Sequence, residues 1–334
     1  MKIKRIFIRL THWEFWPAWI SNLPVIFFWL WFSLKSRSFG FFAAANPSIS
    51  TGGAFGESKF DILDQVNIKW KPHTIYAKTS MPLPTITSFP IVCKPNIGER
   101  GFQVKICKDE AELHHYHSNA KSDYLIQDYI NYPMELSVLH YRFPTCETGN
   151  ISSICLKEYL HVVGDGKTNV AFLMKQNNRT LLQIGKLRLA EDVLQSIPKF
   201  GEKVILSKIG NHGKGCKFIN ATHLISDELI AAFDKVSLSL NDIYFARYDL
   251  KCKSIEDLSQ LKNFSILEIN GITSEPAHIY DPNFGMLNAY RDLYKNWKMI
   301  YKISKKSKEE GNSYMNLSSL IKEFKKHQKL MKTR

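Results

Sequence analysis

Two short segments carry most of the chemistry that this sequence predicts. Arg247 and Asp249 lie in the run FARYDL, and Glu268 and Asn270 lie in the later run ILEING. Side chains alternate across a strand, so each pair shares one face if both segments are strands. Side by side, the strands would bring two carboxylates, an amide oxygen and a guanidinium to one point. Such oxygen ligands suit Mg²⁺, usually completed by substrate phosphates. The sequence therefore predicts a polyphosphate–metal site.

The surrounding segments are expected to form the elements that position these residues. Apolar and β-branched runs between turn residues predict strands over 89–94, 102–106, 124–128, 135–141 and 154–163. Helices are expected over 109–120 and from 226 to about 240. Strands and helices do not alternate regularly, which disfavours a doubly wound fold. We therefore expect an α+β fold with a mostly antiparallel sheet.

Two motifs in the first half of this region could bind a nucleotide. Lys94 precedes the glycine-containing run 95–101, so its ammonium could contact phosphate while the loop folds over it, although a surface lysine beside a turn is the more frequent case. The run lacks Walker A spacing, which excludes a P-loop. Residues 127–130 form a hinge-like element whose backbone could read an adenine edge. Glu135 could accept bonds from ribose hydroxyls, and an ordinary exposed strand residue is equally compatible.

Two polar loops follow. Residues 163–168 read VGDGKT, and Lys167 could face a substrate from this turn, although a Gly/Asp hairpin explains the pattern locally. Residues 210–215 form a second loop, rich in donors and without specific meaning by itself.

The order of these motifs over about residues 80–300 resembles the ATP-grasp superfamily, on the side of D-alanine–D-alanine ligase and cyanophycin synthetase. This resemblance implies two α+β subdomains that clasp ATP. It implies that Lys94 binds phosphates, that residues 98–101 form a mobile lid, and that Glu135 binds the ribose. The nucleotide-binding set is then Lys94, Gly98, Arg100, Gly101, Gln127, Asp128, Tyr129, Ile130 and Glu135.

The resemblance also implies the catalytic and metal-binding roles. Asp249, Glu268 and Asn270 become ligands of one or two Mg²⁺ ions, and Arg247 stabilises the transferred phosphoryl group. Lys167 lies in a run that resembles the VVGDGK segment of cyanophycin synthetase, and it joins Arg247 in the catalytic set without a specific role.

The sequence departs from the family pattern at two places. The hinge position usually held by Glu is Gln127, and because backbone groups read adenine, ATP binding is expected to survive. The usual N-terminal substrate domain is replaced by an aromatic segment and a glycine-rich loop, in which Glu57 could contact substrate. The sequence therefore does not identify the substrates.

The implied activity is ligation. A carboxylate attacks ATP to form an acyl phosphate, and an amine then displaces phosphate. The expected partners are ATP, Mg²⁺, and carboxylate and amine substrates that are either small soluble molecules or lipid-linked ones. Two alternatives remain open: an ATP-grasp kinase that phosphorylates a small molecule, and a non-catalytic, membrane-associated nucleotide-binding protein.

The N-terminal segment is strongly apolar. Residues 15–34 carry no charge, and five of the seven tryptophans lie between Trp13 and Trp31. Pro17 and Pro24 interrupt a helix, and residues 24–35 would cover only roughly 18 Å of a ~30 Å hydrocarbon core. An in-plane or re-entrant membrane hairpin is the first expectation. A true span and a buried hairpin packed on the protein are the alternatives, and no cleavage site of a signal peptide follows.

Charge and cysteine usage complete the expectations. The formal net charge is +14, and residues 302–334 hold nine lysines and one arginine against three glutamates. This tail suits an anionic surface such as acidic lipid or an acidic substrate, and an ordinary solvated helix face is equally compatible. Nucleic acid is disfavoured, because the aromatic residues cluster at the opposite terminus. Six cysteines without a CxxC motif indicate reduced thiols. We expect a location at the cytoplasmic membrane face, or otherwise in the cytoplasm. The expected divisions are an aromatic segment (1–45), a loop and linker (46–88), an ATP-grasp domain (89–300) and a basic helical tail (301–334).

Overall fold

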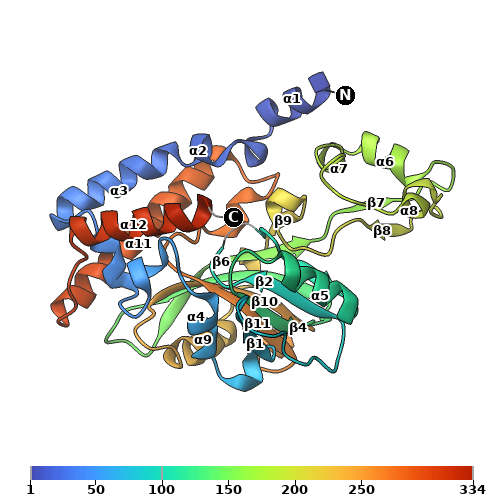
Figure 1. Ribbon diagram of the computed structural model, residues 1–334. Coiled ribbons are helices and arrows are strands. Elements are labelled where there is room, and N and C mark those ends of the chain that lie inside the picture. The colour runs from blue at the N-terminus through green and yellow to red at the C-terminus, as the bar shows by residue number, and fades with distance from the viewer. Residues whose placement is uncertain (1, 99–100, 333–334) are drawn as a thin grey trace.

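The computed structural model describes residues 2–98 and 101–332, without the side chains of residues 18 and 19. Arg100, predicted to belong to a phosphate lid, lies outside the described residues. Two antiparallel sheets form the centre of the molecule (Figure 1). The smaller sheet has the order β1 (Thr74–Ala77), β4 (Tyr124–Asp128), β2 (Ile91–Pro95), β3 (Lys105–Cys107). The larger sheet has the order β11 (Phe264–Asn270), β10 (Phe245–Cys252), β5 (Met134–Arg142), β6 (Gly149–Glu158), β9 (Lys217–Asn220).

Every named strand pair is antiparallel, which confirms the expected mixed fold with mostly antiparallel sheets. Two predicted strands were wrong in extent. The first of these, β3, begins only at Lys105, because Gln103 adopts a left-handed turn conformation with φ 53°. The predicted strand 154–163 divides into β6 and β7 (His161–Val163), because the Leu160 carbonyl accepts bonds from Leu206 and Ser207 and turns the chain into a separate lobe.

That lobe projects to one side of the sheets (Figure 1). It pairs β7 with β8 (Lys203–Ile205) and carries three short helices, α6 (Val170–Gln176), α7 (Asn178–Leu181) and α8 (Glu191–Gln195). Its small core, which includes Val162, Val170 and Leu206, is separate from the cores of both sheets. The lobe is therefore a packing unit of its own, and Arg179 of α7 ties it to the Cys216 carbonyl just before β9.

The larger sheet has one apolar and one polar face. Leu136, Tyr248 and Ile266 point into a core built with α4 (Lys59–Asp64) and α9 (Asp227–Leu238). Because neighbours along a strand alternate, Ser137 and Asp249 point to the opposite face. The helices that support the sheets are α5 (Glu110–Asn119) beside the smaller sheet and α10 (Ile255–Ser259) beside α9. Short 3₁₀ segments lie at η4 (Ile68–Trp70), η5 (His212–Lys214), η6 (Thr222–Leu224) and η7 (Ala277–Tyr280).

The aromatic N-terminal segment packs on the rest of the protein. It forms α1 (Lys2–Thr11), η1 (Trp13–Phe15), α2 (Ala18–Ser21) and α3 (Leu23–Ser36), followed by η2 (Phe41–Ala45) and η3 (Ser50–Gly53). Phe32 of α3 stacks on Tyr294 and Tyr301 of α11 (Met286–Glu309), and α12 (Leu317–Lys332) lies beside them (Figure 1). No helix among the described residues is both long enough and apolar enough to cross a bilayer. The packing is that of the buried-hairpin alternative, although one side of α3 stays exposed.

Candidate functional site

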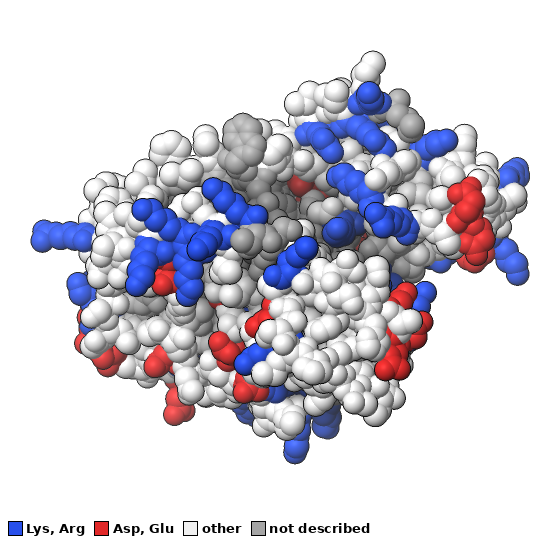
Figure 2. Space-filling view, viewed as in Figure 1, with Lys and Arg blue, Asp and Glu red and all other residues white. Residues whose placement is uncertain are grey.

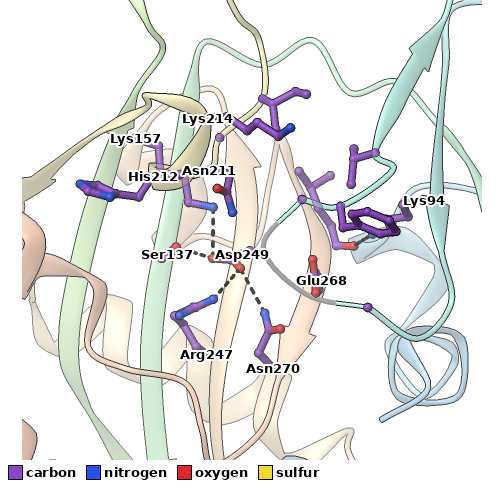
Figure 3. A pocket seen from close by; sticks show the side chains of 18 of the residues that line it. Lys94, Ser137, Lys157, Asn211, His212, Lys214, Arg247, Asp249, Glu268 and Asn270 are labelled. Carbon is purple, nitrogen blue, oxygen red and sulfur yellow. Dashed lines mark hydrogen bonds and ion pairs between the residues drawn. The ribbon is translucent and has the colours of Figure 1, made fainter. Parts of the chain in front are cut away.

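The two segments singled out first are neighbouring strands of the larger sheet. Asp249 on β10 lies directly opposite Glu268 on β11, and Arg247 lies opposite Asn270. All four side chains line one cavity of ≈ 870 Å³, which we call the main cavity (Figure 3). The structure therefore brings the predicted catalytic arginine and the three predicted metal ligands together.

Asp249 is at the centre of a polar network. Its carboxylate accepts hydrogen bonds from four side chains: Ser137 Oγ, Lys157 Nζ at 3.2 Å, Arg247 Nη2 at 3.2 Å and Asn270 Nδ2 at 3.1 Å. Burial raises the pKa of Asp249. Arg247 and Lys157 lower it by a larger amount, so the pKa of Asp249 lies well below its ordinary value. The carboxylate is consequently ionised throughout the physiological range.

The second carboxylate pairs with two lysines from other parts of the chain. Glu268 Oε1 lies 2.8 Å from Lys59 Nζ. Burial raises the pKa of Glu268, but Lys59 and Lys94 lower it below its ordinary value. A β-bulge between Asp249 and Leu250 leaves Leu267 without a partner on β10, and its carbonyl accepts a bond from Lys94 Nζ at 2.7 Å. The bulge therefore anchors the lysine of the smaller sheet beside the carboxylates.

These residues fit a Mg²⁺ ion that is shared with phosphate groups. Two ionised carboxylates lie on directly opposed residues, and the Asn270 amide is beside them. Its amide must rotate to present the oxygen, because Nδ2 now donates to Asp249. Within the described ranges, no three His, Cys, Asp or Glu side chains form a complete protein cage. Mg²⁺ commonly uses one or two carboxylates and takes its other ligands from phosphate and water.

The pKa of Lys94 makes its predicted role in phosphate binding testable by pH. Burial lowers the pKa of its ammonium to about 8, although Glu268 opposes this shift. Because only the protonated form attracts phosphate, we expect the affinity for ATP to fall about tenfold between pH 7 and pH 9. Titration of a fluorescent ATP analogue measures this. Lys94→Arg, which stays charged, should flatten the profile. A wild-type affinity that does not change with pH would remove Lys94 from phosphate binding.

The predicted hinge also lines the main cavity, with residues 127–130 at the end of β4. The Gln127 side chain is buried and donates to Thr74 Oγ1 at 3.0 Å, so it supports the smaller sheet. The Ile130 carbonyl accepts a bond from Lys251 Nζ at 2.8 Å. The same ammonium lies 4.8 Å from the Tyr129 ring centre. Lys251, which sequence reasoning missed, therefore fixes the end of the hinge.

Glu135, near the start of β5, also lines the main cavity. Its carboxylate accepts a bond from Tyr159 Oη at 2.6 Å and lies 3.3 Å from Lys157 Nζ. Loop 210–215 passes directly over it: a Cβ on Gly210 would meet Glu135 Oε1 at 1.7 Å. The loop of previously unspecified meaning therefore covers the predicted ribose ligand, and a larger residue at position 210 would displace the Glu135 carboxylate.

The remaining predicted residues are placed differently. Gly98 and Gly101 line the main cavity. Lys167 is exposed in a turn of the side lobe, where Asp165 accepts bonds from the Lys167 and Thr168 amides. Lys167 is not among the residues that line the cavity. The structure therefore does not bring it to Arg247.

The glycine-rich loop 52–57 forms another wall. A Cβ on Gly53 would meet the Gly271 Cα at 2.5 Å, so the two backbones touch where β11 ends. Buried Asn46 fixes the loop: its Nδ2 donates to the carbonyls of Gly52 and Phe245, and its Oδ1 accepts from the amides of Tyr244 and Phe245. The loop carries Glu57 to the cavity, as its predicted substrate role requires.

The N-terminal segment reaches the cavity through Glu14. Its carboxylate lies 2.5 Å from Arg179 Nη2 of the side lobe and 3.0 Å from His212 Nε2. Burial raises the pKa of Glu14, and His212 and Arg179 lower it below its ordinary value. Phe15 stacks on His212. The aromatic segment therefore joins the side lobe to the main cavity, a contact that hydropathy alone does not predict.

Sequence reasoning missed several cavity residues. Lys157 was overlooked within the predicted strand 154–163, although a lysine at alternating spacing with apolar neighbours was a usable signal. Lys59, at the end of the glycine-rich loop, is brought to Glu268 by α4, and no local pattern indicates this long-range contact.

Comparison with known proteins gives structural likenesses alone. No protein-family model and no curated protein matches the chain. A D-alanine–D-alanine ligase from Bacillus anthracis matches at 18% identity and a TM-score of 0.38, covering 73% of this chain and 65% of that one. A bifunctional glutathione synthetase from Pasteurella multocida matches at 14% identity and a TM-score of 0.35, covering 68% of this chain and 34% of that one. An L-amino acid ligase from Bacillus licheniformis matches at 15% identity and 0.36, covering 70% and 45%.

The solved structures thus include the D-alanine–D-alanine ligases to which the sequence resemblance points. This chain spans between 34% and 65% of the lengths of the three proteins named above. TM-scores below 0.5 do not establish an activity, which must follow from the geometry of the cavity.

Proposed function

We propose that this protein is an ATP-dependent carboxylate–amine ligase with an ATP-grasp fold, in which residues 89–300 form the nucleotide-binding part. One observation carries the proposal. Opposed Asp249 and Glu268 meet Lys94 and Arg247 inside a cavity that is walled by both sheets. This combination of cations and oxygen ligands suits the binding of a polyphosphate with Mg²⁺.

The proposed reaction has two steps. A substrate carboxylate oxygen attacks the γ-phosphorus of ATP, the bond to the bridging oxygen breaks, and ADP leaves with that electron pair. A neutral amine then attacks the acyl carbon, phosphate departs and the amine nitrogen loses a proton to solvent. The products are an amide, ADP and phosphate.

The chain's own residues position the reactants and offset charge. Lys94 contacts the phosphates, and Arg247 stabilises the charge on the phosphoryl group in transfer. The glycine-rich lid around Gly98 and Gly101 limits the access of water. A bound Mg²⁺ would neutralise phosphate charge at Asp249, Glu268 and Asn270.

The test is product release by the purified protein with Mg-ATP across a library of amino acids and small carboxylates paired with amines. A ligase releases ADP and free phosphate together, and only with a particular carboxylate–amine pair. ADP without free phosphate would indicate a kinase. ATP binding without turnover for any pair would favour the non-catalytic alternative.

We also propose that the exposed side of α3 lies on the cytoplasmic surface of an anionic membrane, where ATP is present. The outer side of α3 exposes Ile26, Phe27, Leu30, Trp31 and Leu34. Lysines gather over nearby α12, at positions 322, 325, 326, 329 and 332 (Figure 2). Such an apolar and basic combination is typical of interfacial helices.

Vesicle flotation tests this placement. The protein should float with vesicles that contain phosphatidylglycerol and not with neutral ones. Phe27→Asp combined with Trp31→Asp should reduce flotation about fivefold or more, because two charges enter the apolar face. Leu287→Asp, at an exposed position of α11, is the control and should float normally. Equal flotation of all three proteins would refute the placement.

A further inference from the structure

A second cavity lies next to the main one. It has a volume of ≈ 630 Å³ and is lined by residues of α3, α11, α12 and the loop that carries Phe55; we call it the side cavity. Its apolar lining includes Val25, Trp29, Leu293, Trp297, Leu320 and Phe324. Pockets of this size and character bind apolar parts of small molecules.

The side cavity adjoins the main cavity. Ala54, Phe55, Thr273, Ser274 and Glu275 line both. This junction is next to the proposed reaction centre, because Arg247 Nη1 lies 3.4 Å from the Glu275 carbonyl oxygen. A molecule in the side cavity would therefore lie beside Glu275, whose carbonyl contacts Arg247.

The junction contains polar groups that lack partners among the described residues. Ser274 is 4% exposed, and its buried Oγ has no hydrogen-bond partner. The buried Nε of Arg247 likewise has none. Buried polar atoms are normally paired, so these two are candidate partners for the polar end of a ligand that opens the junction.

We propose that the side cavity binds the alkyl chain of an amphiphilic carboxylic acid, whose carboxylate reaches Ser274 and Arg247. The assignment of this acid as the substrate rests on the proposed function, whereas its binding does not. Ile26, Ile321 and Phe324 line the side cavity and are exposed, so the chain can enter between α3 and α12. The site then selects long-chain acids over short ones.

Binding of dansylaminoundecanoic acid to the full chain, without nucleotide or metal, tests the proposal. One molecule should bind, with the blue-shifted emission of an apolar site, and decanoic acid should displace it better than butyric acid. Leu320→Trp fills the side cavity and should weaken binding about tenfold or more, because each excluded methylene weakens it several-fold. Leu287→Trp, on an exposed surface of α11, should bind as the wild type does.

Ser274→Ala tests the polar end. This variant should bind the acid several-fold more weakly and bind the methyl ester of the probe as the wild type does. A general loss of packing would weaken the binding of both. Thermal melting checks that each variant folds. Ile321→Trp, at an exposed position that also lines the side cavity, replaces Leu320→Trp if that variant is unstable.

The proposal is overturned if the probe does not bind, or if it binds equally to wild type and the cavity-filling variant. It is also overturned if Leu320→Trp converts a dimer into a monomer and the wild type binds no probe, because a second copy would then cover this face. Localised probe binding without any ligase activity would reject the proposed function and retain the side cavity. Ligation of short acids without probe binding would retain the proposed function and reject the binding of an acid in the side cavity.

Discussion

The Asp249→Asn variant is expected to lose at least about 10³-fold of the ATP turnover while it keeps the wild-type fold. Asp249 is the group to which Ser137, Lys157, Arg247 and Asn270 all point (Figure 3). Replacing one carboxylate oxygen by an NH₂ group removes a charge and places a donor against cations. The variant should therefore lose metal-assisted phosphate binding and the orientation of Arg247.

Phosphate release in the presence of the best carboxylate–amine pair measures this loss, and circular dichroism measures the fold. Glu268→Gln should behave similarly, because Glu268 is the opposed carboxylate. Asp227→Asn makes the same chemical change at an exposed position in the first turn of α9 and should retain full activity. Wild-type turnover by Asp249→Asn would refute the proposed ligase.

Asn46→Ala is expected to lower the free energy of unfolding by about 3 kcal/mol and to raise the KM for substrate. Fully buried Asn46 joins the carbonyl of Gly52 to the strand β10, through bonds to Tyr244 and Phe245. Alanine removes four buried hydrogen bonds to these backbone groups. The loop 52–57 would then keep its bonds from Ile272 and Thr273 but be held less firmly beside Gly271.

Urea denaturation gives the stability, and the ligase assay gives the KM. Asn150→Ala, at an exposed position of β6, should change the free energy of unfolding by no more than about 0.5 kcal/mol. A stable Asn46→Ala variant with an unchanged KM would show that the loop does not depend on this side chain.

The central strands were predictable because they obey a local rule. Alternation identified Asp249 with Arg247 and Glu268 with Asn270, and the antiparallel register then places the pairs opposite each other. The same rule applied without interruption would put Ile266 on the polar face. In the structure Ile266 and Ile269 share the apolar core, because the bulge shifts the register. A bulge depends on the partner strand, so one segment read alone does not reveal it.

The walls of the main cavity were less predictable. Lys59 and Glu14 reach the cavity through contacts with residues far away in the sequence, and spacing along the chain carries no information about such contacts. The apolar character of residues 15–34 was evident, but hydropathy does not distinguish a lipid from the aromatic surface of α11 as the partner. In the structure Phe32 stacks on Tyr294 and Tyr301 of α11.

Glu14 and His327, near opposite ends of the sequence, both line the main cavity. The protein is made from its N-terminus onward, so the strands that carry Asp249 and Glu268 leave the ribosome before α12 does. A nascent chain therefore carries its reactive groups before their enclosure is complete. Folding of α12 against the earlier strands therefore completes part of the lining of the cavity.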